Sequence, residues 1–549
     1  MKKIVIIVAL VCGAWQQADA QYVSKVWVSD QKDGTYINPI IHADYSDPEV
    51  CAAGDDFYMT ASSFGCTPGL PILHSKDLVN WRLANYALKE IEPTIFFNAP
   101  QHGKGVWAPS IRYHNGEFFI YWGDPDWGIF MVKTKDPLGE WEKPVLVKAG
   151  KGMIDPTPLW DEDGKVYLVH AWAGSRAAFN SVITVCEMNA EGTKVISEPV
   201  LVFDGNDGVN HTIEGPKFYK RNGYYYILAP AGGVVTGWQL ALRSRNVYGP
   251  YESKIVMAQG DTDINGPHQG GWVETCTGES WFINFQDKAM YGRVLHLNPV
   301  KWENDWPVIG VDKDGDGCGK PVKRYKKPDV GRTYPIETPI ESDEFNTRQL
   351  GLQWEWHANY QDTFGFTSDL GYIRIYGHIL SKDFVNFWEV PNLLLQKFPA
   401  EEFTATAKLK VSAKADGQQS GLIVMGWDYG YLGVVKEGDK FILNQVVCKD
   451  AEQRSPETVT HLAELPVSRR FGAGLYPNYE RDIYLQVKVT GGGICYFSYS
   501  LDGRKYTLAG VPFTARQGKW IGAKVGLFST APYGKERGWV DADWFRIDK

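Results

Sequence analysis

The sequence predicts an all-β protein, a five-bladed β-propeller followed by a β-sandwich domain of jelly-roll type. Three observations lead to this prediction: a hairpin pattern that recurs five times, alternating strands in the last third, and a strand-favouring composition. The 549 residues include 21 Trp, 29 Tyr, 25 Phe, 57 Gly and 30 Pro. Such a composition favours short strands joined by tight turns, and the sequence shows no long amphipathic helix.

The first observation is a turn followed by a run of aromatic and β-branched residues, which is typical of a hairpin. It recurs with its first strand residue at Phe57, Phe118, Val166, Tyr224 and Trp281, at spacings of 61, 48, 58 and 57 residues. Units of roughly this length suit four-stranded blades around a central channel. A solenoid is the alternative, but it would have a more uniform period.

The repeats end near residue 310, and residues 320–339 are rich in Pro and Lys. Beyond them, segments such as 403–411 and 484–489 alternate between apolar and polar residues, as the strands of a sandwich do. We expect a signal peptide at 1–20, the propeller at 21–325, a linker at 326–340 and the sandwich at 341–549.

The first twenty residues have the pattern of an export signal. Lys2 and Lys3 precede an apolar stretch at 4–15, and Ala-Asp-Ala at 18–20 suits a cleavage site. A lipoprotein anchor at Cys12 is the alternative. We expect an exported protein, periplasmic or extracellular, without a membrane span, because no later segment has 18 uninterrupted apolar residues.

The net charge limits the partners to be expected, and the cysteine spacing limits the disulfides and metal sites. The net charge is −8, so we do not expect nucleic acid as a partner. Removal of Cys12 leaves seven scattered cysteines without a C-x-x-C pair, which indicates neither a disulfide framework nor a zinc site. A bridge between Cys51 and Cys66 is conceivable, but buried thiols are the simpler interpretation.

Three carboxylic residues occupy nearly the same place in their repeats. Asp47, Asp155 and Glu214 lie ten or eleven residues before the first strand residue of repeats one, three and four. Repeats two and five carry Trp107 and His268 in the corresponding stretch. Because the first strand of each blade lines the channel of a propeller, we expect these five side chains to converge.

Carboxylates that share a pocket raise one another's pKa, so that one stays protonated near neutral pH. A protonated and an ionised carboxyl group are the equipment for hydrolysis of a glycosidic bond. Each acid alone could instead have a structural role, since Asp before Pro starts turns and Glu before Gly-Pro can cap a bend. Their matching positions favour catalysis.

Five motifs in order resemble glycoside hydrolase family 43. They are residues 45–50 (YSDPEV), 74–81 (HSKDLVNW), 106–109 (VWAP), 154–158 (IDPTP) and 213–216 (IEGP). The C-terminal part is similar to the sandwich of the α-L-arabinofuranosidase and β-xylosidase branch. The resemblance implies an inverting hydrolase with Asp47 as general base and Glu214 as general acid. Asp155 would raise the pKa of Glu214 and hold it in position.

The resemblance also implies roles for three further residues. Trp107 would form an apolar wall for the terminal sugar, and Arg293 would contact that sugar or the acidic trio. A core Trp and a surface Arg are the alternatives. His268 would ligate a structural calcium or its water shell, or else be a satisfied core residue. The loop at 312–317 has only the first half of a calcium-binding pattern, and a plain acidic turn is the simpler interpretation.

These expectations combine into a function. We expect an exo-acting glycosidase that releases terminal α-L-arabinofuranose from plant cell-wall oligosaccharides or polysaccharides. It would need no cofactor for the chemistry. A β-D-xylosidase is the nearest alternative. A non-catalytic carbohydrate-binding protein is the alternative from another class, and it would not need three aligned acids.

Overall fold

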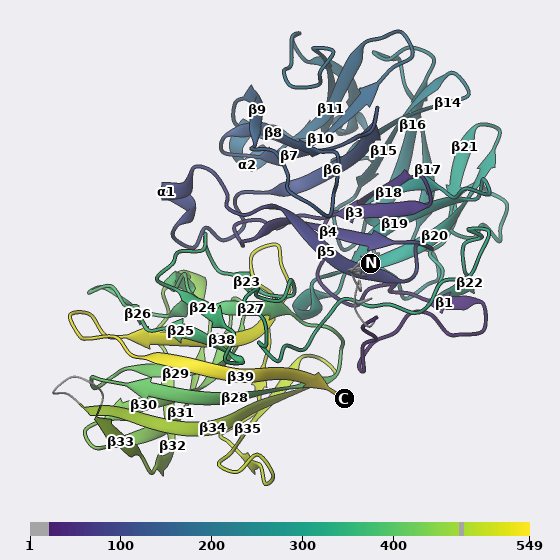
Figure 1. Cartoon of the computed structure of the whole chain (residues 1–549). Coiled ribbons are helices and arrows are strands. Elements are labelled where there is room, and N and C mark those ends of the chain that lie inside the picture. Colours follow the sequence, from purple (N-terminus) through teal and green to yellow (C-terminus); the bar gives the residue numbers. More distant parts are fainter. Residues whose placement is uncertain (1–20, 472–476) are drawn as a thin grey trace, which may run out of the picture.

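The computed structural model describes residues 21–471 and 477–549, which form two β domains (Figure 1). The all-β prediction is confirmed, with five four-stranded sheets in the first domain and two large sheets in the second. The α-helices of the described residues are two of four residues each, α1 (Thr94–Phe97) and α2 (Gly174–Ala177). The predicted signal peptide lies outside the described residues.

The five sheets are the blades of the propeller, and each is an antiparallel meander in chain order. Blade one contains β2 (Glu49–Ala53), β3 (Asp56–Thr60), β4 (Gly69–Ser75) and β5 (Trp81–Leu88). Blade two contains β6 (Trp107–His114), β7 (Glu117–Asp124), β8 (Gly128–Thr134) and β9 (Val145–Ala149). Blade three contains β10 (Met153–Trp160), β11 (Val166–Trp172), β12 (Val182–Met188) and β13 (Val200–Asp204). Blade four contains β14 (Lys217–Arg221), β15 (Tyr224–Ala231), β16 (Trp238–Ser244) and β17 (Glu252–Ala258). Blade five contains β18 (His268–Glu274), β19 (Ser280–Asp287), β20 (Arg293–Glu303) and β21 (Trp306–Ile309).

The recurring sequence position falls in the second strand of every blade. These strands are apolar on both faces because each blade packs between two others. Between blades three and four, for example, Val169 and Ile183 meet Ile227 and Leu240 in one buried cluster. Around the channel, the first strands β2, β6, β10, β14 and β18 contact one another in four neighbouring pairs: β18 with β2, β2 with β6, β6 with β10, and β10 with β14.

The N-terminal segment closes the ring against blade five. β1 (Thr35–Ile37) pairs with β22 (Arg324–Lys326). The Asn38 side chain donates hydrogen bonds to the Leu297 and Val322 carbonyl oxygens, each at 2.8 Å. Its own oxygen accepts the Leu297 N–H at 2.9 Å. The first and last parts of the propeller are thereby joined.

The second domain is a sandwich of an eight-stranded and a nine-stranded sheet. The first contains β23 (Glu355–Trp356), β26 (His378–Ile379), β27 (Leu394–Lys397), β29 (Gln419–Met425), β30 (Tyr429–Glu437), β31 (Lys440–Cys448), β32 (Thr458–Leu465) and β38 (Lys524–Ala531). The second contains β24 (Gly365–Ser368), β25 (Tyr372–Tyr376), β28 (Phe403–Ala413), β33 (Ser468–Phe471), β34 (Pro477–Thr490), β35 (Ile494–Ser500), β36 (Thr507–Leu508), β37 (Phe513–Thr514) and β39 (Trp539–Asp548). In β28, Phe403 and Leu409 face the core while Lys408 and Lys410 face outward, as the alternating sequence predicts.

Residues 327–354 connect the two domains, and the expected boundaries at 325 and 341 remain predictions. The domains are held together by polar contacts. Lys524 Nζ of β38 donates to Cys66 Sγ of the propeller at 3.2 Å. Thr67 of the propeller and Trp356 exchange backbone hydrogen bonds. Asp44 of the propeller accepts the Gly522 N–H of the sandwich at 2.9 Å.

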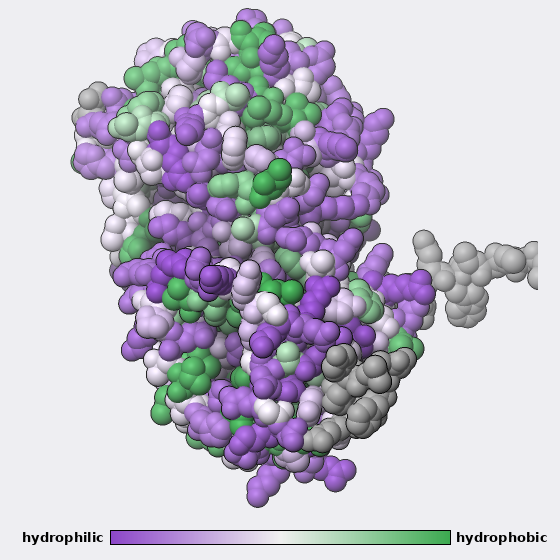
Figure 2. Space-filling model, turned by 90° about the vertical axis from the view of Figure 1, so that its left-hand side faces the viewer, coloured by the Kyte–Doolittle hydropathy of each residue, from purple (hydrophilic) through white to green (hydrophobic). Residues whose placement is uncertain are grey.

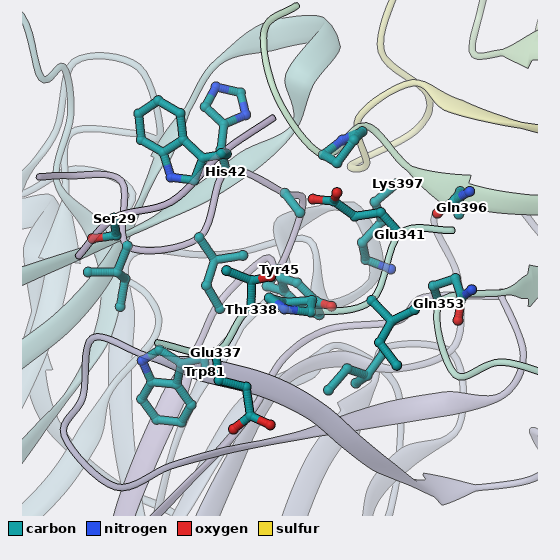
Figure 3. A pocket seen from close by; sticks show the side chains of 18 of the residues that line it. Ser29, His42, Tyr45, Trp81, Glu337, Thr338, Glu341, Gln353, Gln396 and Lys397 are labelled. Carbon is teal, nitrogen blue, oxygen red and sulfur yellow. The ribbon is translucent and has the colours of Figure 1, made fainter. Parts of the chain in front are cut away.

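A small cavity of about 50 Å³ lies where propeller, connector and sandwich meet (Figure 3). Its lining includes His42 and Tyr45 from the propeller, Glu341 from the connector and Gln396 from the sandwich. Burial raises the pKa of Glu341 to about 7, although Ser24 and Tyr22 donate to it. None of the three predicted catalytic acids lines this cavity, which has room for little more than water.

The outer surface is mostly polar in both domains. In Figure 2, hydrophilic side chains predominate on the visible face and apolar ones form separate small patches. Within the two described ranges, no helix has the length and hydropathy needed to cross a membrane. All seven cysteines of the described residues are free thiols, as the scattered spacing predicts.

Candidate active site

A pocket of about 300 Å³ lies at one end of the propeller channel and receives side chains from all five blades and from the sandwich. Its lining includes Asp47, Trp107, Asp155, Glu214, Gln269, Arg293 and Trp520. Five of the six predicted site residues therefore line one pocket. The sixth, His268, lies behind it and approaches Glu214.

The backbone turns through the left-handed region at one residue near the start of each innermost strand. These residues are Asp47 (φ 54°), Ala108 (φ 27°), Asp155 (φ 58°), Gly215 (φ 60°) and Gln269 (φ 24°). A bulge accompanies the turn in blades two, three and five. Asp47 and Asp155 are themselves the left-handed residues of their strands. Glu214, Trp107 and His268 each lie one residue before the left-handed residue of theirs. The sequence spacing of ten or eleven residues predicts nearly the same position for the three acids, and the structure sets Glu214 one residue earlier than the two aspartates.

Asp47 is buried and surrounded by donors. Ser46 Oγ and Ser62 Oγ donate to its Oδ2 at 2.7 and 2.6 Å. Arg293 Nη1 donates to its Oδ1 at 3.1 Å. Ser62 Oγ also accepts the Ala108 N–H at 2.8 Å, so that blade two fixes the hydroxyl that holds this carboxylate. Donors on every side suit an ionised group that accepts a proton.

Asp155 and Glu214 have raised pKa values. Burial raises the pKa of Asp155 to about 7; the Gly215 N–H, which donates to its Oδ2 at 2.7 Å, opposes that rise, and the Asp47 charge adds to it. Burial and then the charges of Asp155 and Asp47 raise the pKa of Glu214 to about 8. The Glu214 side chain is 35% exposed, against 6% for Asp47. Glu214 is thus both a protonated acid and accessible from the pocket.

His268 Nε2 lies 3.6 Å from Glu214 Oε1, and the side chain is fully buried. Burial, followed by the Arg293 charge, lowers the pKa of His268 to about 3, so the ring is neutral at neutral pH. Among the described residues, neither ring nitrogen has a hydrogen-bond partner.

The structure gives the calcium expectation little chemical basis. Across residues 21–471 and 477–549, no three His, Cys, Asp or Glu side chains are grouped to hold a metal ion. Calcium takes six to eight oxygen ligands, whereas His268 offers a ring nitrogen. In the loop at 312–317, the Asp312 carboxylate accepts three backbone N–H groups and Asp314 pairs with Lys320. Structural calcium remains a prediction, and no step of the reaction below depends on it.

Arg293 and Trp107 both line the pocket. Arg293 Nη1 reaches Ser46 Oγ at 2.6 Å as well as Asp47, while its backbone N–H donates to Asp44. The Trp107 ring has edge contacts with Trp520, at 6.3 Å between centroids, and with Phe64. Trp107 is therefore a partly exposed wall residue, not a core residue between blades.

Sequence reasoning did not identify three residues of the site. Ser62 and Gln269 lie close to predicted residues, and an alignment of the five strand starts would have revealed Gln269. Gln269 is buried at the pocket wall, and its Oε1 has no hydrogen-bond partner among the described residues. Trp520 comes from a loop of the sandwich, for which the propeller repeats give no signal.

Comparison with known proteins identifies both domains. Residues 36–307 match the model of glycosyl hydrolases family 43. Residues 342–548 match the β-xylosidase C-terminal concanavalin A-like domain.

Three relatives cover most of the chain. A protein of Xylanibacter ruminicola named "Putative beta-xylosidase" is 37% identical over 514 residues, 92% of this chain and 88% of the relative. A "Beta-xylosidase" of Formosa agariphila is 32% identical, over 94% of this chain and 91% of the relative. A "Non-reducing end alpha-L-arabinofuranosidase" of Bacteroides ovatus is 31% identical, over 76% and 79% respectively.

Proposed function

The chain belongs to glycosyl hydrolase family 43 and is a glycoside hydrolase, and from this premise we propose that it is an inverting, exo-acting enzyme that removes a terminal pentose from plant cell-wall glycans. The observation that supports this most directly is the convergence of three carboxyl groups, from blades one, three and four, on one pocket. Two of them have raised pKa values, while donors surround the third.

In the proposed reaction, Glu214 donates its proton to the oxygen of the departing sugar. Its pKa of about 8 keeps that proton in place at neutral pH. Asp47 removes a proton from a water molecule, whose oxygen attacks the anomeric carbon from the opposite face. The C–O bond to the leaving group breaks as the bond to water forms, and the released sugar has inverted configuration. Asp155 forms and breaks no bond. Its charge raises the pKa of Glu214 and so helps to keep Glu214 protonated.

The pocket shape supports exo action. A cavity of about 300 Å³ is at the small end of the range for ligand sites, which suits one sugar unit. Trp107 and Trp520 meet at its wall, so the propeller and the sandwich together limit its length. A long chain would therefore enter by its end.

The identity of the pentose remains open between two candidates. The sequence prediction named α-L-arabinofuranose first, and a relative of 31% identity is named an arabinofuranosidase. β-D-Xylose is the second candidate because the relatives of 37% and 32% identity carry the name β-xylosidase. Membership of a hydrolase family and three intact acids leave the carbohydrate-binding alternative without support.

The test compares 4-nitrophenyl α-L-arabinofuranoside with 4-nitrophenyl β-D-xylopyranoside, using the wild type and Asp47→Asn. We expect a strong preference for one pentoside and loss of that turnover in the variant. Proton NMR of the first product would show the inverted anomer. Retained configuration, or substantial turnover by Asp47→Asn, would contradict the assigned base. No turnover of either pentoside by the wild type would contradict the substrate class.

We also propose export, on the basis of the signal pattern at 1–20. Mass spectrometry of the protein recovered outside the cytoplasm should give Gln21 as its first residue. An intact N-terminus on cytoplasmic protein would exclude this location.

A further inference from the structure

Three charged side chains fill the propeller channel where the innermost strands meet. Glu49 and Lys217 are each 0% exposed, and Lys217 Nζ lies 3.6 Å from Glu49 Oε2. Glu49 Oε1 forms an ion pair with Arg112 and accepts the Tyr219 hydroxyl at 3.1 Å. The three come from blades one, two and four, so one buried ion cluster links three blades.

Each member of the cluster follows a pocket residue on the same segment. Glu49 lies two residues after Asp47, and Lys217 lies three residues after Glu214. Lys217 Nζ also donates to the Pro109 carbonyl oxygen at 2.9 Å. Lys217 therefore connects the segment of Glu214 with the segments of Asp47 and Trp107.

The Pro109 contact continues to the base itself. Pro109 follows Ala108, whose N–H donates to Ser62 Oγ, and that hydroxyl donates to Asp47. On its other side, Lys217 follows Gly215, whose N–H holds Asp155. A shift of the Lys217 ammonium would thus alter the relative positions of all three acids.

A fully buried lysine is unusual because removing an ammonium group from water costs several kcal/mol. Apolar side chains in place of the whole ion cluster would fill the same space at lower cost, so stability alone does not account for these buried charges. The two fixed partners of Lys217, one carboxylate and one carbonyl oxygen, instead specify the distance between blades one, two and four.

We propose that Lys217 is a positioning residue for hydrolysis, which holds the segment of the general acid Glu214 in register with the segments of Asp47 and Trp107. The inference rests on the proposed function. Lys217 does not touch the substrate. It acts by keeping the proton of Glu214 within reach of the leaving oxygen while Asp47 faces the attacking water.

The test uses the dependence of kcat on the leaving group, in the full-length protein. Lys217→Met keeps the length of the side chain and removes the charge. With the preferred pentose on a poor leaving group, such as a second sugar, we expect kcat to fall by about 100-fold, with KM changed less than about 3-fold. With a 2,4-dinitrophenyl leaving group, which departs without protonation, we expect a loss below about 5-fold.

The matched control is Lys436→Met. Lys436 is another buried lysine, paired with Asp416 in the sandwich, and its loss should leave the leaving-group dependence unchanged. Lys217→Arg restores a cation and should recover part of the lost kcat. If Lys217→Met does not fold, Glu49→Gln breaks the same link and should show the same leaving-group dependence.

Equal losses with both leaving groups, or none, would overturn the positioning role while leaving the proposed function intact. Failure of the wild type to hydrolyse either pentoside would count against the proposed function itself.

Discussion

Gly215 shows how one residue supports two parts of the catalytic site. Its φ of 60° lies in the left-handed region, and a Cβ there would come within 2.6 Å of Gln269 Cγ. Its N–H holds Asp155, so the same backbone turn that admits Gln269 also aims a donor at the carboxylate. Glycine is required here for its missing side chain as well as for its φ.

Gly215→Ala should therefore reduce both stability and activity. We expect a loss of about 2–4 kcal/mol in the free energy of unfolding, from backbone strain and the clash with Gln269, and a lower kcat. Urea unfolding and kinetics measure the two effects. Gly164→Ala is the matched control, because Gly164 has a φ of 82° but no atom within 4 Å of the place that an alanine methyl group would take. Equal losses in the two variants would show that the Gln269 contact has no energetic consequence.

The raised pKa of Glu214 predicts the alkaline limit of activity. Glu214 is active when protonated, so kcat/KM should fall as the pH rises through about 8. Asp155→Asn removes a negative charge that raises the pKa of Glu214, and the alkaline limb should therefore move to lower pH. A pH profile of kcat/KM with a disaccharide substrate measures the alkaline limb of the wild type and that of Asp155→Asn. An alkaline limb that stays in place would mean that Asp155 does not influence the acid.

At the scale of the element, second strands and first strands differed in how far they could be predicted. The second strands carry a turn and a continuous apolar run, so Phe118 and Tyr224 were recognisable as repeat positions. The first strands contain bulges and left-handed residues, which depend on contacts with other blades. The sequence therefore indicated where Glu214 lies to within one residue, but not its offset from Asp155.

The N-terminal segment should contribute to the stability of the whole ring. Asn38→Ala leaves the buried Leu297 N–H and two carbonyl oxygens without their side-chain partner. We expect a loss of about 3 kcal/mol in the free energy of unfolding, measured by urea denaturation. Asn98→Ala, at the exposed end of α1, is the control and should change stability by less than about 1 kcal/mol. Equal free energies of unfolding for the two variants would show that the N-terminal segment does not stabilise the propeller.

At the scale of the whole molecule, the site is shared between the domains. Both domains were predictable because repeats and strand alternation are local patterns. Trp520 was not, because its contact with Trp107 depends on how the domains pack, and no local pattern records that. The packing itself depends on contacts such as the backbone hydrogen bonds between Thr67 and Trp356, which lie far apart in the chain.

Trp520→Ala should separate the catalytic contribution of the sandwich from its structural one. Trp520 is 44% exposed, so its removal should change the melting temperature little. It also lines the pocket, and we expect kcat/KM for the preferred pentoside to fall by roughly 10-fold as the wall is lost. Tyr533→Ala, a more exposed aromatic residue of the same domain, should leave the kinetics unchanged. Identical kinetics for the two variants would show that the sandwich supplies no part of the pocket.

The charged cluster that fills the channel also determines the order in which products leave. Because Glu49 and Lys217 are fully buried between the blades, a sugar chain has no open route through the propeller behind the pocket. In the proposed exo reaction, the freed monosaccharide would lie at the bottom of the pocket, with the shortened chain between that sugar and the solvent. The chain must depart first and rebind for every further cut. Degradation is then distributive, and a time course should accumulate a ladder of every intermediate length.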